Sequence, residues 1–176
     1  SIITVCLNSE DTILDTLNSV LTQNYENIEH IIVDGGSTDR TIYFLKNYNF
    51  KNKKILFKKK CSLYNSINLG IKLATGDIVS ILHSDDIYNS PKTISNVIKK
   101  IKKSKKEIFF GDVIYYKKNF KNIIRYYSSL NFKRSLMKYG FMPPHTGSFY
   151  KKRIFMKYGY YKDFRIAGDF EHLLRL

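Results

Sequence analysis

The sequence predicts an α/β fold with a mostly parallel sheet flanked by helices, and two observations lead to it. Short apolar and β-branched runs alternate along the chain with segments whose apolar residues recur at helical spacing. This alternation is typical of βαβ units, whose crossover helices pack on the faces of a parallel sheet. The length of 176 residues suits a single domain, and an aromatic fraction of 15% excludes a chain too polar to collapse.

Four strands are expected in the first half of the chain, and each is a largely apolar run, as in strands buried on both faces. They lie at residues 2–7, 30–33, 54–57 and 78–82. The helix after the first strand has Asn8 or Ser9 as its N-cap, and its apolar face comprises Ile13, Leu14, Leu17, Val20 and Leu21. The next two helices are expected at 38–47, with Ile42 and Leu45 inward, and along a face formed by Leu63, Ile67, Ile71 and Ala74.

The second half of the chain is expected to contain shorter elements. Pro91 opens a helix with a buried stripe at Ile94, Val97, Ile98 and Ile101. Further strands are expected at 108–111, 113–116 and 148–150, and helical segments at 132–139 and 153–157. The last residues, 171–176, form an amphipathic helix without a C-cap, which indicates a piece of a longer protein.

The net charge of +15 is distributed unevenly along the chain. Residues 1–50 carry two basic and seven acidic residues, whereas residues 51–176 carry 28 basic and eight acidic residues. This basicity raises the alternative of a nucleic-acid-binding or membrane-surface-binding module without catalysis. However, the lysines at 99–106 fall on the outer side of a predicted helix, where a solvated face is the commonest explanation, and no nucleic-acid-binding motif surrounds them.

The sequence also bears on the compartment in which the protein works. No apolar run approaches the roughly 18 residues of a membrane span, and no signal-peptide pattern opens the chain. Cys6 and Cys61 lack disulfide-framework or zinc-site spacing and are expected to be free thiols. We therefore expect a cytoplasmic protein, with a basic surface suited to peripheral contact with an anionic membrane at the inner face of the plasma membrane.

Polar residues follow three of the predicted strands, at the sheet edge where ligands bind in open parallel sheets. The adjacent Asp85 and Asp86 would repel one another, which a divalent cation or ribose hydroxyls would relieve; alternatively, one of them caps the turn before Pro91. The turn at 34–37 lacks the glycine spacing of dinucleotide and phosphate-loop motifs. It is either a tight turn with Ser37 as an N-cap or a site where Asp34 bonds to a base edge.

Six segments carry a more specific signal: TVCLN at 4–8, VDGGSTD at 33–39, YNSINLGI at 64–71, ATGD at 74–77, LHSDD at 82–86 and AGDFE at 167–171. In order and spacing they resemble family 2 glycosyltransferases of the GT-A fold. Residues 64–86 and 145–150 are most similar to bacterial members that build surface polysaccharides, of the colanic-acid type. The resemblance implies one GT-A catalytic domain over 1–176 with a Rossmann-like sheet, a nucleotide-binding half at 1–90, an acceptor and catalytic half at 91–176, and a missing C-terminal region.

The resemblance also implies a set of substrate-binding residues. Asp34 would contact the uracil or other base, Asp85 would face the ribose or the sugar, and the region from Thr4 to Asn8 would line the nucleotide pocket. The full set is Thr4, Val5, Asn8, Asp34, Asn65, Asn68 and Asp85.

The metal and catalytic residues are implied in the same way. Asp86 would hold Mn²⁺ or Mg²⁺ on the diphosphate, and His145 would ligate the metal or touch the diphosphate, unless it is an ordinary hydrogen-bonded histidine. Asp169 would be the general base, its alternative being an ordinary N-cap, and Glu171 is a second candidate base.

The implied activity is inverting transfer of a sugar from a nucleotide-diphosphate sugar, in the first place a UDP-sugar, to a hydroxyl of a glycan or lipid-linked acceptor. The pathway implied is the synthesis of bacterial surface polysaccharide, O-antigen or capsule, with no nucleic-acid partner. Three positions depart from the family pattern: Gly35 replaces a second acid, Cys61-Ser62 replaces Lys-Gly, and Asn65 replaces Asp. These departures affect base and sugar recognition.

Overall fold

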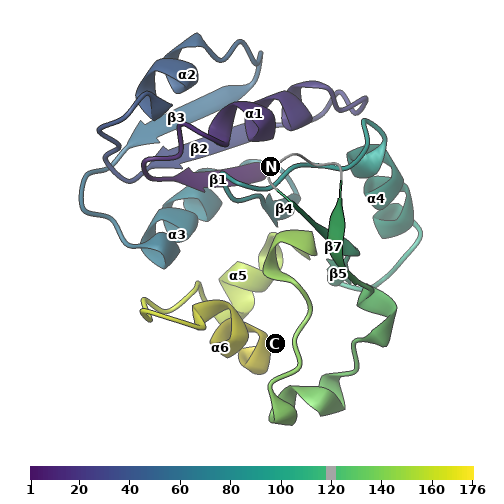
Figure 1. The fold of residues 1–176 in the computed structure, drawn as a ribbon. Helices are drawn as coiled ribbons and strands as arrows, with labels where there is room; N and C mark the ends of the chain where they lie inside the picture. Colours follow the sequence, from purple (N-terminus) through teal and green to yellow (C-terminus); the bar gives the residue numbers. More distant parts are fainter. Residues whose placement is uncertain (118–121) are drawn as a thin grey trace.

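The computed structural model describes residues 1–117 and 122–176 and confirms an α/β fold with a mostly parallel sheet (Figure 1). Within these residues the main sheet has the strand order β3-β2-β1-β4-β8-β5. Its strands are β1 Ile2–Cys6, β2 His30–Asp34, β3 Lys53–Phe57, β4 Ile78–Ile81, β5 Ile108–Phe110 and β8 Ser148–Lys151. The first four are parallel, while β8 is antiparallel to both β4 and β5.

Helices cover both faces of the sheet (Figure 1). Helices α1, α2 and α4 pack on one face, and α3, α5 and α6 pack on the other. Their bounds are α1 Ile13–Leu21, α2 Thr41–Asn47, α3 Leu63–Leu73, α4 Thr93–Lys102, α5 Arg153–Tyr158 and α6 Gly168–Arg175. Because both faces are covered, β1 and β2 are buried over their whole length, as their unbroken apolar runs predict.

The closest approach between helix and sheet occurs where α3 crosses β1. A Cβ atom built on Gly70 would lie 2.4 Å from Cγ2 of Ile3, well inside van der Waals contact. Ile67 and Ile71, on the same side of α3, are fully buried against β1 and β2. The absence of a side chain at position 70 therefore sets how closely the helix sits on the sheet.

Several helix boundaries differ from the sequence-based expectations. Helix α1 begins at Ile13 rather than after Ser9, because the Ser9 carbonyl accepts the N–H groups of Thr12 and Ile13 in a separate turn. Leu14 and Leu21, which were expected on its buried face, are about half exposed. Ser37 is not the N-cap of α2, since that helix begins at Thr41, whose N–H bonds to Oδ1 of Asp39 at 3.0 Å.

The second half of the chain departs further from expectation. Residues Arg134–Tyr139 form a 3-10 helix, not an α-helix, and it ends at Gly140 with a φ of 82°. An unpredicted strand, β7 at Ile123–Tyr127, pairs with β6, Val113–Tyr116, in a separate two-stranded sheet. Most side chains of β7 are exposed, so the sequence carries no burial alternation there. Two short 3-10 helices, Ser129–Asn131 and His145–Gly147, complete the described elements.

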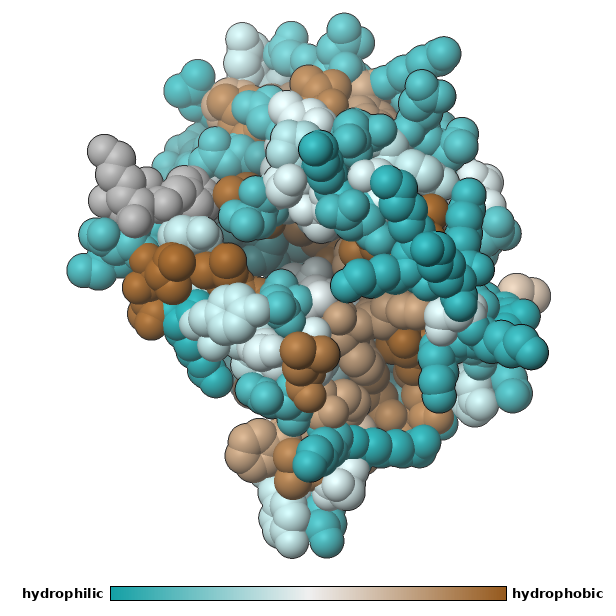
Figure 2. Space-filling view, turned by 90° about the vertical axis from the view of Figure 1, so that its right-hand side faces the viewer, coloured by the Kyte–Doolittle hydropathy of each residue, from teal (hydrophilic) through white to brown (hydrophobic). Residues whose placement is uncertain are grey.

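The lysines of α4 and the residues after it form a solvated face. Those that are exposed are Lys99, Lys100, Lys102, Lys103, Lys105 and Lys106. Figure 2, which looks onto the side where α4 lies, shows a broad hydrophilic area above a hydrophobic recess. Within the described residues, no helix has both the length and the apolar character that crossing a membrane requires.

Candidate active site

Several of the residues expected to carry the chemistry lie at one edge of the sheet. Strands β2, β1 and β4 are parallel neighbours, so their carboxyl ends lie side by side. Asn8, Asp34 and His83 come at or just after these ends. The turns that follow β1 and β4 are joined by a 2.9 Å hydrogen bond between the hydroxyls of Ser9 and Ser84.

Asn8 connects the end of β1 to the turn after β2 through hydrogen bonds. Its backbone is left-handed, with a φ of 49°, which asparagine tolerates better than most residues. The backbone N–H of Asn8 donates to Oγ of Ser37 at 2.9 Å, and its Oδ1 accepts from the N–H of Thr38 at 2.8 Å. Asn8 therefore stands at the expected edge, and its side-chain oxygen is engaged by the neighbouring turn.

Asp34 is fully buried and bonds to its own turn. Its Oδ1 accepts from the N–H groups of Gly36 and Ser37 at 3.0 and 2.9 Å, and its Oδ2 accepts from the Ser37 hydroxyl. The Cys6 thiol lies 3.6 Å from Oδ2, and burial, followed by this carboxylate, raises its pKa. Asp34 was expected to contact a base, and in this structure its carboxylate organises the turn at that edge.

Thr4 and Val5 were expected to line the nucleotide pocket, but they lie inside the sheet. Both are buried within β1, and the Thr4 hydroxyl is 3.0 Å from Nε2 of His30. Tyr48 bonds to the other ring nitrogen of His30 at 2.9 Å. The physical reason is that side chains of a central strand point into the layers above and below the sheet, not toward its edge.

The acidic pair after β4 has a different environment from Asp34. Asp85 is exposed, while Asp86 is partly buried, and a hydrogen bond from the backbone of His83 favours the ionised form of its carboxylate. Burial, followed by the charge of Asp85, raises the pKa of Asp86 to about 6. A cation held beside both carboxylates would relieve this repulsion.

Two histidines face each other next to the acidic pair. The rings of His83 and His145 are 5.6 Å apart, and His145 also packs edge-on against Tyr161 at 5.5 Å. Among the described residues, neither ring nitrogen of His145 has a hydrogen-bond partner, although both are shielded from solvent. Burial, followed by His83, lowers the pKa of His145 to about 4, so the ring is neutral near pH 7.

Asp169 lies in the first turn of α6, close to these histidines. Burial lowers the pKa values of both His83 and His145, and the negative charge of Asp169 acts in the opposite direction. The Tyr64 hydroxyl, from α3, donates to its Oδ1 at 3.0 Å. Ala167, immediately before the helix, has a left-handed φ of 63° and no side-chain N-cap bond forms there.

The second candidate base, Glu171, is committed to ion pairs. Lys162 and Arg175 each lie 2.9 Å from its Oε1. Burial opposes ionisation, but the hydrogen bonds from these two side chains outweigh it and lower the pKa of Glu171. Of the two carboxylates, Glu171 is thus the one held by two charged partners.

Asn65 and Asn68, which were expected to bind substrate, contact the protein itself. Asn65 donates to Oδ2 of Asp163 at 2.7 Å. Asn68 is bonded through both its amide atoms to the backbone of Tyr161. Sequence reasoning missed the contact of Tyr64 with Asp169 and that of His83 with His145, although Tyr64 shares a helix face with Asn68 and His83 stands two residues before Asp85.

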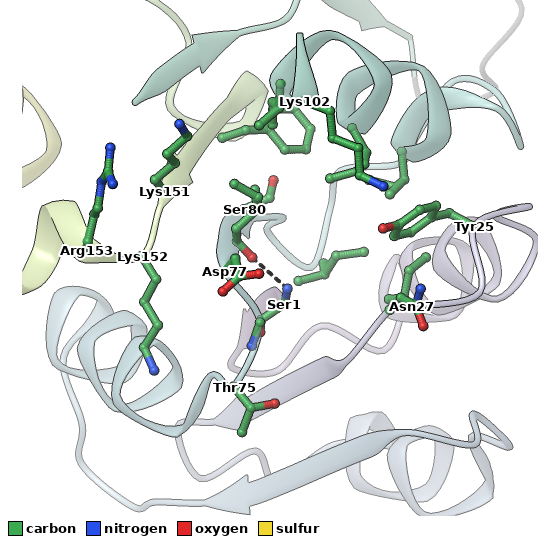
Figure 3. A pocket seen from close by; sticks show the side chains of 18 of the residues that line it. Ser1, Tyr25, Asn27, Thr75, Asp77, Ser80, Lys102, Lys151, Lys152 and Arg153 are labelled. Atoms are coloured by element: carbon green, nitrogen blue, oxygen red, sulfur yellow. Dashed lines mark hydrogen bonds between the residues drawn. The ribbon is translucent and has the colours of Figure 1, made fainter. Parts of the chain in front are cut away.

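A large hollow lies away from these groups. It has a volume of about 1010 Å³ and opens at the starts of β1 and β4, near Ser1 and Asp77, the end of the sheet opposite the acidic pair (Figure 3). Lysines 102, 151 and 152 and Arg153 stand around it, over isoleucine walls. None of the expected site residues lines it.

A mostly parallel sheet with its acidic pair at the carboxyl end of β4 defines the GT-A class of glycosyltransferases, and the comparisons with known proteins agree. The chain belongs to glycosyl transferase family 2, whose family model matches residues 1–161. An uncharacterised glycosyltransferase of Mycobacterium tuberculosis is 30% identical over 99% of this chain and 67% of its own length. A PGL/p-HBAD biosynthesis glycosyltransferase of Mycobacterium bovis is 28% identical over 99% of this chain and 68% of its own length.

Solved structures share the fold. S. aureus TarS 1-349 in complex with UDP-GlcNAc superposes with a TM-score of 0.79 at 21% identity, over 99% of this chain and 52% of that one. A mannosyltransferase from Pyrobaculum calidifontis, in complex with GDP-Man and Mn²⁺, has a TM-score of 0.71 at 18% identity, over 97% of this chain and 49% of that one. The chain thus spans about half the length of these structures.

Proposed function

We propose that the protein is an inverting glycosyltransferase that moves a sugar from a nucleotide-diphosphate sugar to an acceptor hydroxyl. The observation that carries the proposal is the convergence of Asp85, Asp86, His145 and Asp169 at the carboxyl edge of the sheet in a family 2 chain. Asp85 and Asp86 would serve the leaving diphosphate, and Asp169 would serve the attacking hydroxyl.

The donor is proposed to bind across the turns after β1, β2 and β4, with Asp85 toward its ribose or sugar. A UDP-sugar is the first candidate donor and a GDP-sugar the second, because fold neighbours were solved with UDP-GlcNAc and with GDP-Man. Asn8 and the backbone of the turn at 34–37 line this edge, so they would contact the base and ribose in place of the buried Thr4 and Val5.

The residues present fit a divalent cation. Asp86 is partly buried beside the charge of Asp85, and the His145 nitrogens have no partner among the described residues. No cluster of three or more potential ligands exists within the described residues, so the ion would need substrate phosphates and waters as its remaining ligands. Asp86, with His145, would hold the ion, which when bound neutralises charge on the departing nucleoside diphosphate.

Asp169 is proposed as the general base. It would take the proton of the acceptor hydroxyl while that oxygen attacks the anomeric carbon and the bond to the diphosphate breaks on the opposite side. A single displacement of this kind inverts the anomeric configuration. The carboxylate lies in the first turn of α6, at the positive end of the helix dipole.

The acceptor is proposed to be a glycan or a lipid-linked intermediate of bacterial surface polysaccharide synthesis. Similarity to a PGL/p-HBAD biosynthesis glycosyltransferase of Mycobacterium bovis supports a role in a biosynthetic pathway. The exposed lysines of α4 would allow peripheral contact with anionic lipid from the cytoplasmic side. The alternative of a nucleic-acid-binding module is not favoured, since family membership accounts for the motifs and a solvated helix accounts for the lysines.

Calorimetric titration of the full-length protein tests the proposal. UDP-GlcNAc and GDP-mannose would be titrated in Mn²⁺ and in EDTA, and at least one is expected to bind only with metal. Asp86→Asn should abolish the metal dependence, whereas Asp77→Asn, an exposed acid at the opposite end of β4, should not. Absence of metal-dependent binding to either donor, together with salt-sensitive DNA binding, would instead support the nucleic-acid module.

A further inference from the structure

The segment that leads to Asp169 is held by the first two turns of α3. Asn68 donates through Nδ2 to the carbonyl of Tyr161 at 2.7 Å and accepts the N–H of the same residue at 3.0 Å. The rings of Tyr64 and Tyr161 stack at 5.8 Å. Two residues of α3 spaced by four positions, on one helix face, therefore anchor position 161 through both its backbone and its side chain.

A second anchor lies two residues further on. The Asn65 side chain donates to Oδ2 of Asp163 at 2.7 Å, and the Ser62 hydroxyl donates to its Oδ1. An aspartate at position 65 would place two carboxylates in this contact, so the amide is the compatible residue here. The departure of Asn65 from the family pattern is thus matched by an acceptor, Asp163, in the same protein.

The third contact reaches the proposed base itself. The Tyr64 phenol oxygen accepts the backbone N–H of Gly168 at 2.9 Å and donates to Oδ1 of Asp169 at 3.0 Å. A Cβ on Gly168 would lie 2.7 Å from Cε2 of Tyr64, so the ring packs directly on the backbone there. Among the described residues, Oδ2 of Asp169 has no hydrogen-bond partner.

We propose that Tyr64 is the positioning residue for Asp169, and that α3 is the seat on which the base-bearing segment docks. The phenol holds Oδ1 and directs Oδ2 toward the acceptor hydroxyl. The inference rests on the proposed role of Asp169 as base. Tyr64 itself exchanges no proton with the substrate, and it acts only by fixing the orientation of the carboxylate.

Tyr64→Phe tests the inference, because phenylalanine keeps the ring contacts with Tyr161 and Gly168 and removes only the hydroxyl. In the full-length protein, release of UDP from UDP-GlcNAc or of GDP from GDP-mannose would be measured with Mn²⁺ and water as acceptor. We expect kcat to fall about 10- to 100-fold, the size of effect that misplacing a reacting group produces, with the donor KM within about twofold of wild type.

Tyr48→Phe is the matched control. It also removes a buried tyrosine hydroxyl, the one bonded to His30, on a side of the sheet away from Asp169. Its kcat and KM should both stay at the wild-type values. Wild-type kcat in Tyr64→Phe would overturn the positioning role, and a parallel loss of donor affinity would assign Tyr64 a purely structural role.

A charge exchange tests independently whether the segment that bears Asp169 docks on α3. Asn65→Asp should lower kcat by repelling Asp163, and the double variant Asn65→Asp/Asp163→Asn should restore it, because one amide and one carboxylate again face each other. Failure of the second change to restore turnover would argue against the docking of this segment on α3.

The same experiments separate this inference from the proposed function. If Asp169→Asn keeps wild-type turnover, the base assignment fails whatever Tyr64 does. If wild-type protein turns over neither donor, the contact itself is tested by hydrogen exchange, since the Gly168 amide should exchange faster in Tyr64→Phe than in Tyr48→Phe. Equal exchange in the two variants would refute the contact.

Discussion

Asp34 and Asp86 show how two aspartates at strand ends acquire different roles. Asp34 is followed by Gly-Gly-Ser, whose backbone N–H groups and hydroxyl turn back to satisfy its carboxylate. Asp86 follows another acid, is partly buried, and has its pKa raised to about 6 by burial and by Asp85. The first arrangement stabilises a turn, and the second is costly unless a cation or a donor sugar nucleotide binds there.

At the scale of single residues, Asp169→Asn is the direct test of the base. We expect turnover to fall about 100- to 10,000-fold, the contribution typical of a general base, because the amide cannot accept the acceptor's proton. Donor affinity, measured by calorimetry, should stay close to wild type because the proposed donor contacts lie on other elements.

Glu171→Gln serves as the control for this variant. Glu171 lies on the same helix turn but is engaged by Lys162 and Arg175, so its loss should leave turnover within a few fold of wild type. A larger loss of turnover in Glu171→Gln than in Asp169→Asn would mean that Glu171, and not Asp169, is the base.

At the scale of elements, sequence patterns predict α3 and the four parallel strands, but not what their polar residues touch. The apolar spacing at Ile67 and Ile71 follows directly from burial against the sheet. The partners of Asn65 and Asn68 lie more than 90 residues further along the chain, and no local pattern encodes such contacts. Strand β7 was not predicted either, because its side chains are mostly exposed and show no alternation of buried and exposed positions.

Gly70→Ala tests the close approach of α3 to β1. The added methyl group would meet Cγ2 of Ile3, and overpacking of this kind typically costs about 1–3 kcal/mol. Alanine also favours the helix by up to about 1 kcal/mol, so we expect a net loss of about 1–2 kcal/mol in the free energy of unfolding. Urea denaturation would measure it.

Gly111→Ala is the matched control for packing. A Cβ at Gly111 would meet only a carbonyl oxygen at 3.5 Å, an ordinary contact distance. Its unfolding free energy should lie within about 0.5 kcal/mol of wild type. Equal stability of the Gly70 and Gly111 variants would mean that α3 moves outward without cost.

At the scale of the whole molecule, buried histidines couple the fold to pH. Burial lowers the pKa values of His30, His145 and His172, to about 3, 4 and 4 respectively. The folded protein keeps these rings neutral, whereas the unfolded chain protonates them below about pH 6.5. Their contribution to stability is therefore fully present above pH 6.5 and is lost as the pH falls toward 4.

The resulting prediction is acid lability of the metal-free protein. Asp86 acts in the opposite direction between pH 6 and 4, where the folded state retains a proton that the unfolded state has released. Near pH 5 the unfolded state then binds about two more protons than the folded state, so the unfolding free energy should fall by about 2.7 kcal/mol per pH unit. Urea denaturation in EDTA from pH 7 to 5 would measure the slope.

His30→Gln should reduce this slope by about one proton, or about 1.4 kcal/mol per pH unit. A stability that does not change between pH 7 and 5 would contradict the neutral, buried state of the three histidines.

The contact between Tyr64 and Asp169 also has a consequence for synthesis of the chain on the ribosome. The two residues are separated by 105 positions, which take about 5–20 seconds to translate at typical rates of synthesis. During that interval β1 to β4 and α3 are already synthesised, while Asp169 is not. Under the proposed function, a nascent chain would therefore gain its proposed donor-binding turns before its proposed base, and the order of translation would delay reactivity until α6 has docked.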